Sequence, residues 1–340
     1  MDEPRPLSRI DVPSPAPAKD DAGAYRALTS SAAWVDRSES GKLALTGDGA
    51  AEFLNGQVTA DVLALEPGHG TYAALLTSKG KIISDLRILA VEDGGGSELL
   101  LLCERSGLQA LFDHLRRHLI GFDAELHKRT VQQTLHSVIG PRIPAALTAS
   151  LGPAPHDHVS ATLADVPVRL VRTTLGVDVV ASAEDGPAVS AALRDAGLPE
   201  VDDAAAEIVR VEAGIPRLHH DIDDGVMPAE AGIVEQAVSF TKGCYVGQET
   251  VARLHWRGRP NRHLRGLQLD RAVPVGTALF AEERQVGSVT SIVESPERGP
   301  IALALIRREV EPGGTVVARP DEGAPTTAQV VALPFAGTTA

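Results

Sequence analysis

Short apolar segments, separated by glycine, proline and charged residues, recur through most of the chain. Residues 42–46 alternate between polar and apolar side chains, and residues 98–103 form a short apolar run, so both are expected to be strands. Residues 71–76 and 81–91 lie on either side of Ser78-Lys79-Gly80 and are expected to pair as a β-hairpin. The pattern therefore predicts a sheet in the first third of the chain.

Segments with helical spacing are interleaved with strand-like ones. The expected helices cover residues 50–55, 108–119, 188–196 and about 202–213. Asp202 or Asp203 can cap the last of these helices, and Gly214 can end it. Two further strands are expected at residues 166–172 and 177–181. This alternation predicts an α+β or α/β layer structure, of which we expect α+β, rather than a helical bundle or a sandwich.

The pattern of apolar segments and turn residues changes after Arg262. Short strand candidates are separated by proline, glycine and charged turns, at residues 264–269, 278–280, 286–293, 301–307, 315–319 and 327–333. Many short strands with frequent turn residues are typical of small barrels. A C-terminal all-β domain is therefore expected over residues 262–335.

Composition limits where the protein acts. Hydrophobic residues make up 43% of the chain and charged residues 23%, as in ordinary folded domains. A net charge of −13 argues against a surface made for nucleic acid or acidic membranes, so any anion site must be a local basic patch. The apolar runs are shorter than the roughly 20 residues that cross a bilayer, so no membrane contact is expected.

The two cysteines and the first residues of the chain point to the cytoplasm. Cys103 and Cys244 are far apart in sequence and have no CxxC spacing, which suits a reducing compartment. Residues 1–22 contain charges and five prolines but no apolar stretch of the kind found in signal peptides. They are expected to form a disordered tail, and the protein is expected to be cytoplasmic.

Residues 239–253 carry the densest candidate chemistry. Gly243 and Gly247 allow close backbone approach, and Gly247 can begin a helix with Glu249 in its first turn. Cys244 would then precede a helix N-terminus, with Lys242 two residues away, and both features favour a reactive thiolate. The alternative is a buried, inert cysteine, since free cysteines are often buried.

The segment Lys242-Gly243-Cys244-Tyr245-Val246-Gly247-Gln248-Glu249 resembles the KGCYxGQE signature of the YgfZ-type folate-binding proteins, which are relatives of the glycine-cleavage aminomethyltransferase. Further blocks of similarity occur in the family's order over roughly residues 25–335. They are Leu45 to Ala50 with Phe53 to Thr59, Ser78 to Asp85, and Arg210-Val211-Glu212-Ala213-Gly214-Ile215-Pro216.

The resemblance implies a three-subdomain ring around a reduced folate, closed by the C-terminal β-barrel. Residues 23–258 would form the folate-binding core, as two interleaved subdomains. The implied role is an accessory one in the assembly or repair of iron–sulfur clusters in client proteins, with tetrahydrofolate as the cofactor and no stable metal. The resemblance assigns catalytic roles to Cys244, Lys242 and Asp85. It assigns folate contacts to Glu212, Arg210, Asp85, Tyr245, Gly243, Gly247, Gln248, Glu249 and Arg253.

Two residues of these blocks bear on activity. Glu212 is expected at the C-terminal end of a helix, where the dipole opposes a carboxylate, so a ligand or another partner must compensate it. The alternative is an exposed ion pair with Arg210 or Arg217.

The aminomethyltransferases carry two adjacent acids where this chain has Ser84-Asp85. The missing acid favours folate binding without aminomethyl transfer; a folate-dependent one-carbon transferase and a folate-sensing scaffold are the alternatives.

A basic run and several histidine pairs remain. The run consists of Arg253, Arg257, Arg259, Arg262 and Arg265, with His255 and Trp256 among them. It can bind the glutamate tail of folate, an acidic partner or RNA, or be a solvated linker. The pairs His114/His118, His156/His158 and His219/His220 lack a third ligand in a metal-binding register, so no metal site is expected.

Overall fold

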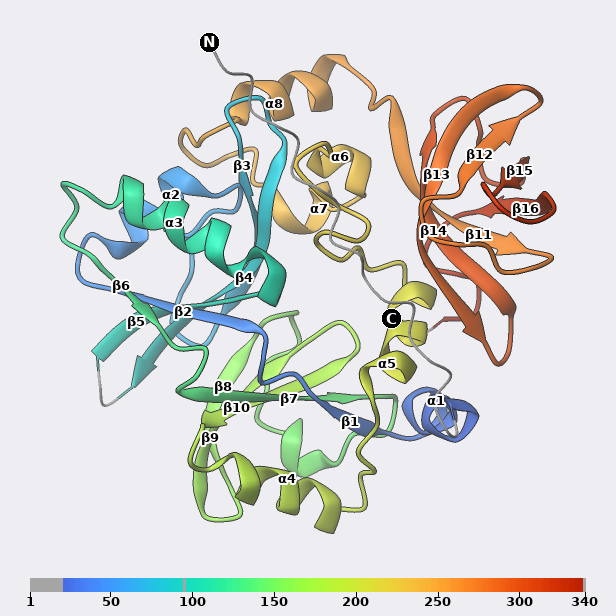
Figure 1. Ribbon diagram of the computed structural model, residues 1–340. Helices are drawn as coiled ribbons and strands as arrows, with labels where there is room; N and C mark the ends of the chain where they lie inside the picture. The colour runs from blue at the N-terminus through green and yellow to red at the C-terminus, as the bar shows by residue number, and fades with distance from the viewer. Residues whose placement is uncertain (1–20, 94–95, 339–340) are drawn as a thin grey trace.

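The computed structural model describes residues 21–93 and 96–338. Figure 1 shows three lobes, of which two are built on five-stranded sheets and the third is a closed barrel. The tail predicted over residues 1–22 falls outside the described residues except for its last two positions. These belong to helix α1 (Asp21–Ser30) instead.

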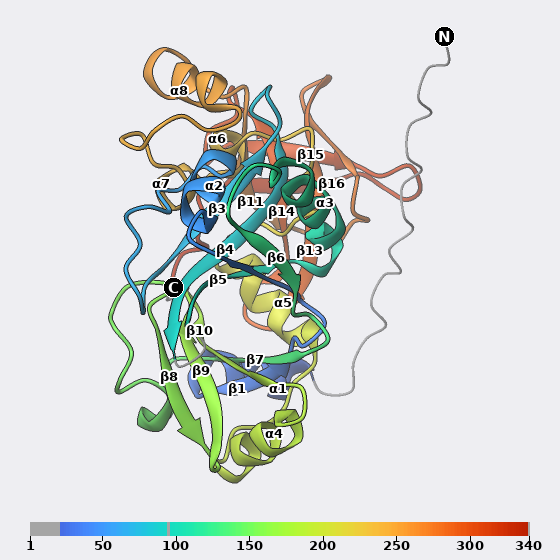
Figure 2. The same ribbon diagram turned by 90° about the vertical axis from the view of Figure 1, so that its left-hand side faces the viewer.

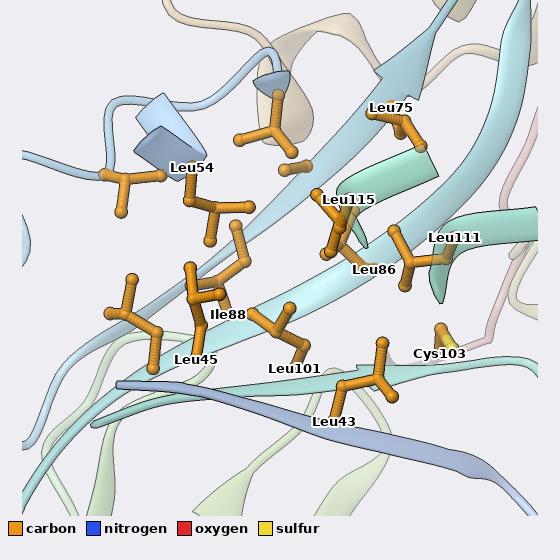
Figure 3. Packing of buried hydrophobic residues seen from close by; sticks show 14 of the residues in the cluster. Leu43, Leu45, Leu54, Leu75, Leu86, Ile88, Leu101, Cys103, Leu111 and Leu115 are labelled. Atoms are coloured by element: carbon orange, nitrogen blue, oxygen red, sulfur yellow. The ribbon is translucent and has the colours of Figure 1, made fainter. Parts of the chain in front are cut away.

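The first lobe is an antiparallel sheet in the strand order β3-β4-β5-β2-β6. Its strands are β2 (Gly41–Thr46), β3 (Gly70–Leu76), β4 (Ile82–Asp93), β5 (Gly96–Cys103) and β6 (Glu125–Lys128). Helices α2 (Ala50–Gln57) and α3 (Leu108–His118), the latter preceded by the short η1 (Arg105–Gly107), cover one face. Figure 3 shows the leucine-rich core between this face and the helices. The predicted strands and hairpin of this region are confirmed.

The second lobe has the strand order β1-β7-β10-β9-β8, also antiparallel. Its elements are β1 (Ala33–Asp36), β7 (Gln133–Ile139), η2 (Ala145–Leu147), β8 (His158–Leu163), β9 (Val166–Arg172), β10 (Gly176–Ser182) and α4 (Gly186–Asp195). Because β1 precedes the whole first sheet in sequence, the chain enters this lobe, leaves it and returns. The two sheets meet face to face where Leu89, Leu100 and Leu102 pack against Leu135, Val171 and Val180.

Four helices connect the second lobe to the barrel. They are α5 (Asp203–Glu212), α6 (Pro228–Ala231), α7 (Val234–Ala237) and α8 (Gln248–Arg257). Asp202 caps α5 by accepting a hydrogen bond from the backbone N–H of Ala205 at 3.0 Å, as one of the two alternatives predicted. Helix α5 packs against α1, against β1 of the second lobe and against β13 of the barrel, so it joins the second lobe to the barrel. Figure 2 shows it between the second lobe and the barrel.

The third lobe is the predicted barrel, closed in the order β11-β14-β13-β12-β15-β16. Its strands are β11 (Arg262–Leu269), β12 (Ala278–Ala281), β13 (Arg284–Ser295), β14 (Gly299–Arg307), β15 (Thr315–Arg319) and β16 (Thr326–Val331). Each strand expected from the sequence is present, because turns and alternation mark its ends clearly. The α+β class and the C-terminal barrel are therefore confirmed. Within the described part of the chain, no helix has both the length and the apolar character needed to span a membrane.

Candidate functional site

Asp85 lies near the start of β4, and its carboxylate is held by one tyrosine. Tyr72, on the paired strand β3, donates a hydrogen bond from its hydroxyl to Oδ2 of Asp85 at 2.7 Å. The other carboxylate oxygen, Oδ1, is buried and has no hydrogen-bond partner among the described residues. A buried carboxylate oxygen without a partner is costly for the fold and points to a ligand or proton-transfer role.

The surroundings of Asp85 shift its ionisation towards neutral pH. Burial is the main cause that raises its pKa from 3.8 to about 6; the Tyr72 hydrogen bond opposes the shift, and the negative charge of Glu104 adds to it. The nearby His219 lowers the pKa of Asp85. Burial and the neighbouring Asp85 together raise the pKa of Tyr72 well above 10. At pH 7 the pair is therefore mostly a carboxylate beside a protonated phenol, an arrangement that can accept a proton.

Ser84, the neighbour of Asp85, does not share its surroundings. Side chains alternate along a strand, and Ser84 is fully buried on the other face of β4, against η1. Its hydroxyl donates to the carbonyl oxygen of Asp85 at 3.1 Å. An acid at position 84 would therefore not lie beside the Asp85 carboxylate. The argument that Ser84 removes a second acid from the reaction is wrong for this geometric reason.

Glu212 is at the predicted C-terminal end of α5, and its carboxylate is 3% exposed. It accepts hydrogen bonds from the hydroxyl groups of Tyr25, at 3.0 and 3.1 Å, and of Ser295, at 2.6 Å. The Arg298 guanidinium lies 3.5 Å away. These three side chains, from α1 and the barrel, offset the unfavourable helix dipole. The alternative pairing with Arg210 or Arg217 on an exposed face is wrong.

Arg210 is buried two residues earlier on the same helix, and its guanidinium makes several hydrogen bonds. Its guanidinium donates to Glu207 at 2.6 and 2.8 Å, to Asp221 at 2.7 Å, to Ser291 at 2.8 Å and to the carbonyl oxygen of Ile215. No hydrogen bond or ion pair within residues 21–93 and 96–338 joins Arg210 or Glu212 to Asp85. The structure therefore places both residues in the junction between α5 and the barrel, and their contact with folate stays a prediction.

The ammonium group of Lys242, in the signature segment, binds the C-terminal end of helix α2. It donates to the carbonyl oxygens of Asn55 at 2.5 Å, Val58 at 2.9 Å and Ala60 at 2.7 Å, at and just beyond the helix C-terminus. Cations are favoured there because the last carbonyls lack partners within the helix. Burial lowers the pKa of Lys242 to about 8, which leaves it charged at neutral pH. The three hydrogen bonds of Lys242 go to these carbonyls rather than to the Cys244 thiol, and its influence on that thiol stays a prediction.

The rest of the signature packs against the hairpin of the first lobe. Gly247 has φ +86°, and a Cβ there would lie 2.6 Å from the carbonyl oxygen of Thr77, so only glycine fits. Tyr245 is 7% exposed, and the Lys242 ammonium lies 5.1 Å from its ring centre. Helix α8 begins at Gln248 with Glu249 in its first turn, as predicted. Gly243, Glu249 and Arg253 are exposed, and Gln248 is half-buried.

Cys244 is exposed, whereas Cys103 is buried in the core of the first lobe. The interpretation of Cys244 as a buried, inert residue is therefore wrong. Burial raises the pKa of Cys103 to about 12, which suppresses its thiolate further.

Native protein is expected to react at one of its two thiols with a chromogenic disulfide reagent, and at both after denaturation. Peptide mapping should place the native label on Cys244, and Cys244→Ser should abolish it while Cys103→Ser should not. Labelling of Cys103 in the native chain would contradict the buried position of that side chain.

The two histidines of the predicted helical pair lie together on α3 and make hydrogen bonds within the chain. His114 contacts Gln57 through Nε2 at 3.2 Å, and His118 contacts the carbonyl oxygen of His114 through Nδ1 at 2.8 Å. Within the described ranges no group of three or more metal-ligating side chains occurs.

Tyr72 and Glu104 were not predicted as site residues. Tyr72 could not be assigned from the turn alone, since a regular hairpin around residues 78–80 would pair residue 72 with residue 86. A register shift between Leu75 and Leu76 pairs it with residue 87 instead and so brings its side chain near Asp85. Glu104 follows the end of β5, and no pattern around it indicates that it lies near Asp85. Its position depends on how β5 pairs with β4.

Comparisons with known proteins agree with this architecture. The family model of the GCVT N-terminal domain matches residues 18–242, and that of the glycine cleavage T-protein C-terminal barrel domain matches residues 262–336. The aminomethyltransferase of Streptomyces coelicolor is 31% identical over 91% of this chain and 87% of its own length. That of Streptomyces avermitilis is 30% identical over 92% and 88%. A crystal structure of the glycine cleavage system aminomethyltransferase T from Bartonella henselae superposes with a TM-score of 0.82 at 23% identity, over 94% of this chain and 90% of that one.

Proposed function

The chain belongs to the glycine cleavage T-protein family, and we propose that it binds a reduced folate beside Asp85 and uses this carboxylate in one-carbon transfer of the aminomethyltransferase kind. The observation that carries the proposal is the buried, unpartnered Oδ1 of Asp85 next to the Tyr72 hydroxyl. The curated relatives that match most of this chain are named aminomethyltransferases.

The residues present suit a reduced pterin. Such a ligand carries N–H groups that can donate to a carboxylate, and its ring nitrogens bear the one-carbon unit. Oδ1 of Asp85 is a free acceptor for one of these N–H groups, while Tyr72 fixes the carboxylate through Oδ2. Because the pKa of Asp85 is about 6, the carboxylate can take up a proton near neutral pH and return it.

A thermal-shift titration with tetrahydrofolate, followed by an ammonia-release assay, tests the two halves of the proposal separately. A ligand at 100 times its dissociation constant stabilises the folded state by about 2.7 kcal/mol, which is a clear shift. Ammonia should then be released when the aminomethyl-carrying partner of the glycine cleavage system is added. Absence of stabilisation would contradict the proposed folate binding. Stabilisation without ammonia release would show that the chain binds folate but is not a transferase.

A second candidate is the accessory role in iron–sulfur cluster assembly or repair implied by the KGCYVGQE segment. The observation in its favour is the exposed thiol of Cys244, carried on a loop that Lys242 and Tyr245 fix to the first lobe. A loop anchored on both sides of an exposed cysteine presents that thiol in a defined position. Two unpaired cysteines also suit the cytoplasm, where we place the protein.

The variant Cys244→Ala separates this candidate from the first. Cells carrying it should lose iron–sulfur enzyme activity while purified protein keeps tetrahydrofolate binding. Normal iron–sulfur enzyme activity in those cells, with the variant present at normal level, would leave only a folate-binding or folate-sensing role for the chain.

A further inference from the structure

Helix α8 presents a group of unpaired arginines at the edge of the molecule. The structure divides the basic run into two parts, since Arg262 pairs with Glu230 at 3.0 Å and Arg265 with Glu311 at 3.8 Å. Arg253, Arg257 and Arg259 are exposed, and their side chains have no ion pair or hydrogen bond in the described part of the chain. These three arginines, together with Trp256, are called the α8 patch below. Figure 1 shows α8 on the rim of the molecule, between the hairpin β3–β4 and the barrel.

The α8 patch is unusual for this protein. The chain carries a net charge of −13, yet three cations lie within seven residues without acidic partners. The helix dipole favours cations at the C-terminus of α8, but its effect fades within one turn and does not extend to Arg259 beyond the helix end. Trp256 is 70% exposed, whereas the other tryptophan, Trp34, is 1% exposed. Arginine and tryptophan are the residues most enriched at the energetic centres of protein interfaces.

An apolar notch adjoins the patch. A cavity of about 30 Å³ is lined mainly by apolar side chains of α6, α7, α8 and the loop before α8: Met227, Pro228, Val234, Phe240, Val251 and Leu254. Phe240 joins notch and patch, since its ring lies 3.9 Å from that of His255 and 6.1 Å, edge-on, from that of Trp256. The cavity exceeds the roughly 10–15 Å³ that admits a single water molecule, so it can take the tip of an aliphatic side chain.

We propose that the α8 patch docks an acidic segment of a partner protein. Carboxylates of the segment pair with Arg253, Arg257 and Arg259, and an apolar side chain covers Trp256 and enters the notch. Charge complementarity selects an acidic partner, because the basic patch stands out against an acidic molecule. The notch selects protein over nucleic acid, because a nucleic acid has no aliphatic side chain to fill it. The inference does not depend on folate binding.

Trp256 provides the measurement, because it is the exposed one of the two tryptophans. The full chain is titrated with a synthetic glutamate-rich peptide that has a central leucine, and quenching of tryptophan fluorescence by acrylamide is followed. The peptide should bind, protect Trp256 from acrylamide and bind more weakly as salt is added. The double variant Arg253→Glu/Arg257→Glu should weaken binding at least about tenfold, because like charges then face each other. A peptide with serine in place of the leucine should also bind more weakly.

Matched controls keep the proposal falsifiable. Arg116→Glu/Arg117→Glu makes the same charge change at the C-terminus of α3 and should leave peptide binding unchanged. An equal loss in that control would show non-specific attraction and overturn the proposal, as would failure of the acidic peptide to bind. Tighter binding of a single-stranded oligonucleotide of equal charge would make the patch a nucleic-acid site instead. If the serine peptide bound as tightly as the leucine peptide, the apolar notch would not be part of the docking surface.

Discussion

Replacing Asp85 by asparagine is expected to lower folate-dependent turnover by about 10²- to 10⁴-fold, the range that a positioned acid or base contributes. Asparagine keeps the size of the side chain and can still accept the Tyr72 hydrogen bond, but it cannot exchange a proton. Turnover of the unmodified chain should rise with pH through about 6, where Asp85 ionises, and this limb should be absent from the variant. Steady-state rates of ammonia release across a pH series provide the measurement.

The same variant should not lose stability, which separates a catalytic role from a structural one. The pKa of Asp85 is raised from 3.8 to about 6, so between these values the folded chain binds more protons than the unfolded chain. Its contribution to stability is therefore lost as pH rises through that window, and the ionised carboxylate is unfavourable at pH 7. Asp85→Asn should unfold at the same or a higher temperature. Asp113→Asn, an exposed position on α3, is the control and should change neither property. Full turnover in Asp85→Asn would exclude Asp85 from the reaction.

Replacing Asp221 by alanine is expected to lower the free energy of unfolding by about 3 kcal/mol or more, because it breaks a buried ion pair. Asp221 is 2% exposed and accepts hydrogen bonds from Arg210 at 2.7 Å, Thr290 at 2.6 Å and Ser291 at 2.8 Å. Its loss leaves the buried Arg210 with only Glu207 as an acidic partner. Denaturation with urea, followed by circular dichroism, measures the change.

An exposed ion pair supplies the comparison for this prediction. Glu200 contacts Arg194 at 2.6 Å, but both side chains are about half exposed, so Glu200→Ala should cost less than about 1 kcal/mol. If Asp221→Ala were no more costly than Glu200→Ala, the network between α5 and β13 would not be what holds the barrel to the core. A change in tetrahydrofolate binding in Asp221→Ala, with the fold intact, would instead support the predicted folate contact of Arg210.

The signature segment shows how far a motif can be interpreted before its surroundings are known. Its residues predicted the start of α8 and a glycine at a close approach, and both are found at Gly247. The partners of Lys242 were not predicted, because its ammonium is bound by carbonyl oxygens at and just beyond the end of α2, nearly two hundred residues earlier in the chain. A side chain as long as lysine can reach partners in several directions, and only packing selects among them.

The sequence by itself determined the fold class, the barrel and four of the five strands of the first sheet, because alternation, turn residues and caps act over a few neighbouring positions. It did not indicate β6 of that sheet, or β1 and β8 of the second. Nor did it indicate β7, the strand that links β1 to β10 in the second sheet. Two of its buried positions are the polar His136 and Ser137, whose partners Ser190 and Asp178 lie more than forty residues away. Tertiary structure alone decided the partners of Glu212 and Arg210, the contact between Tyr72 and Asp85, and which arginines of the basic run stay unpaired. Each depends on elements distant in sequence, and the physical reason is the same throughout: hydrogen bonding and burial are satisfied by whichever groups the fold brings close.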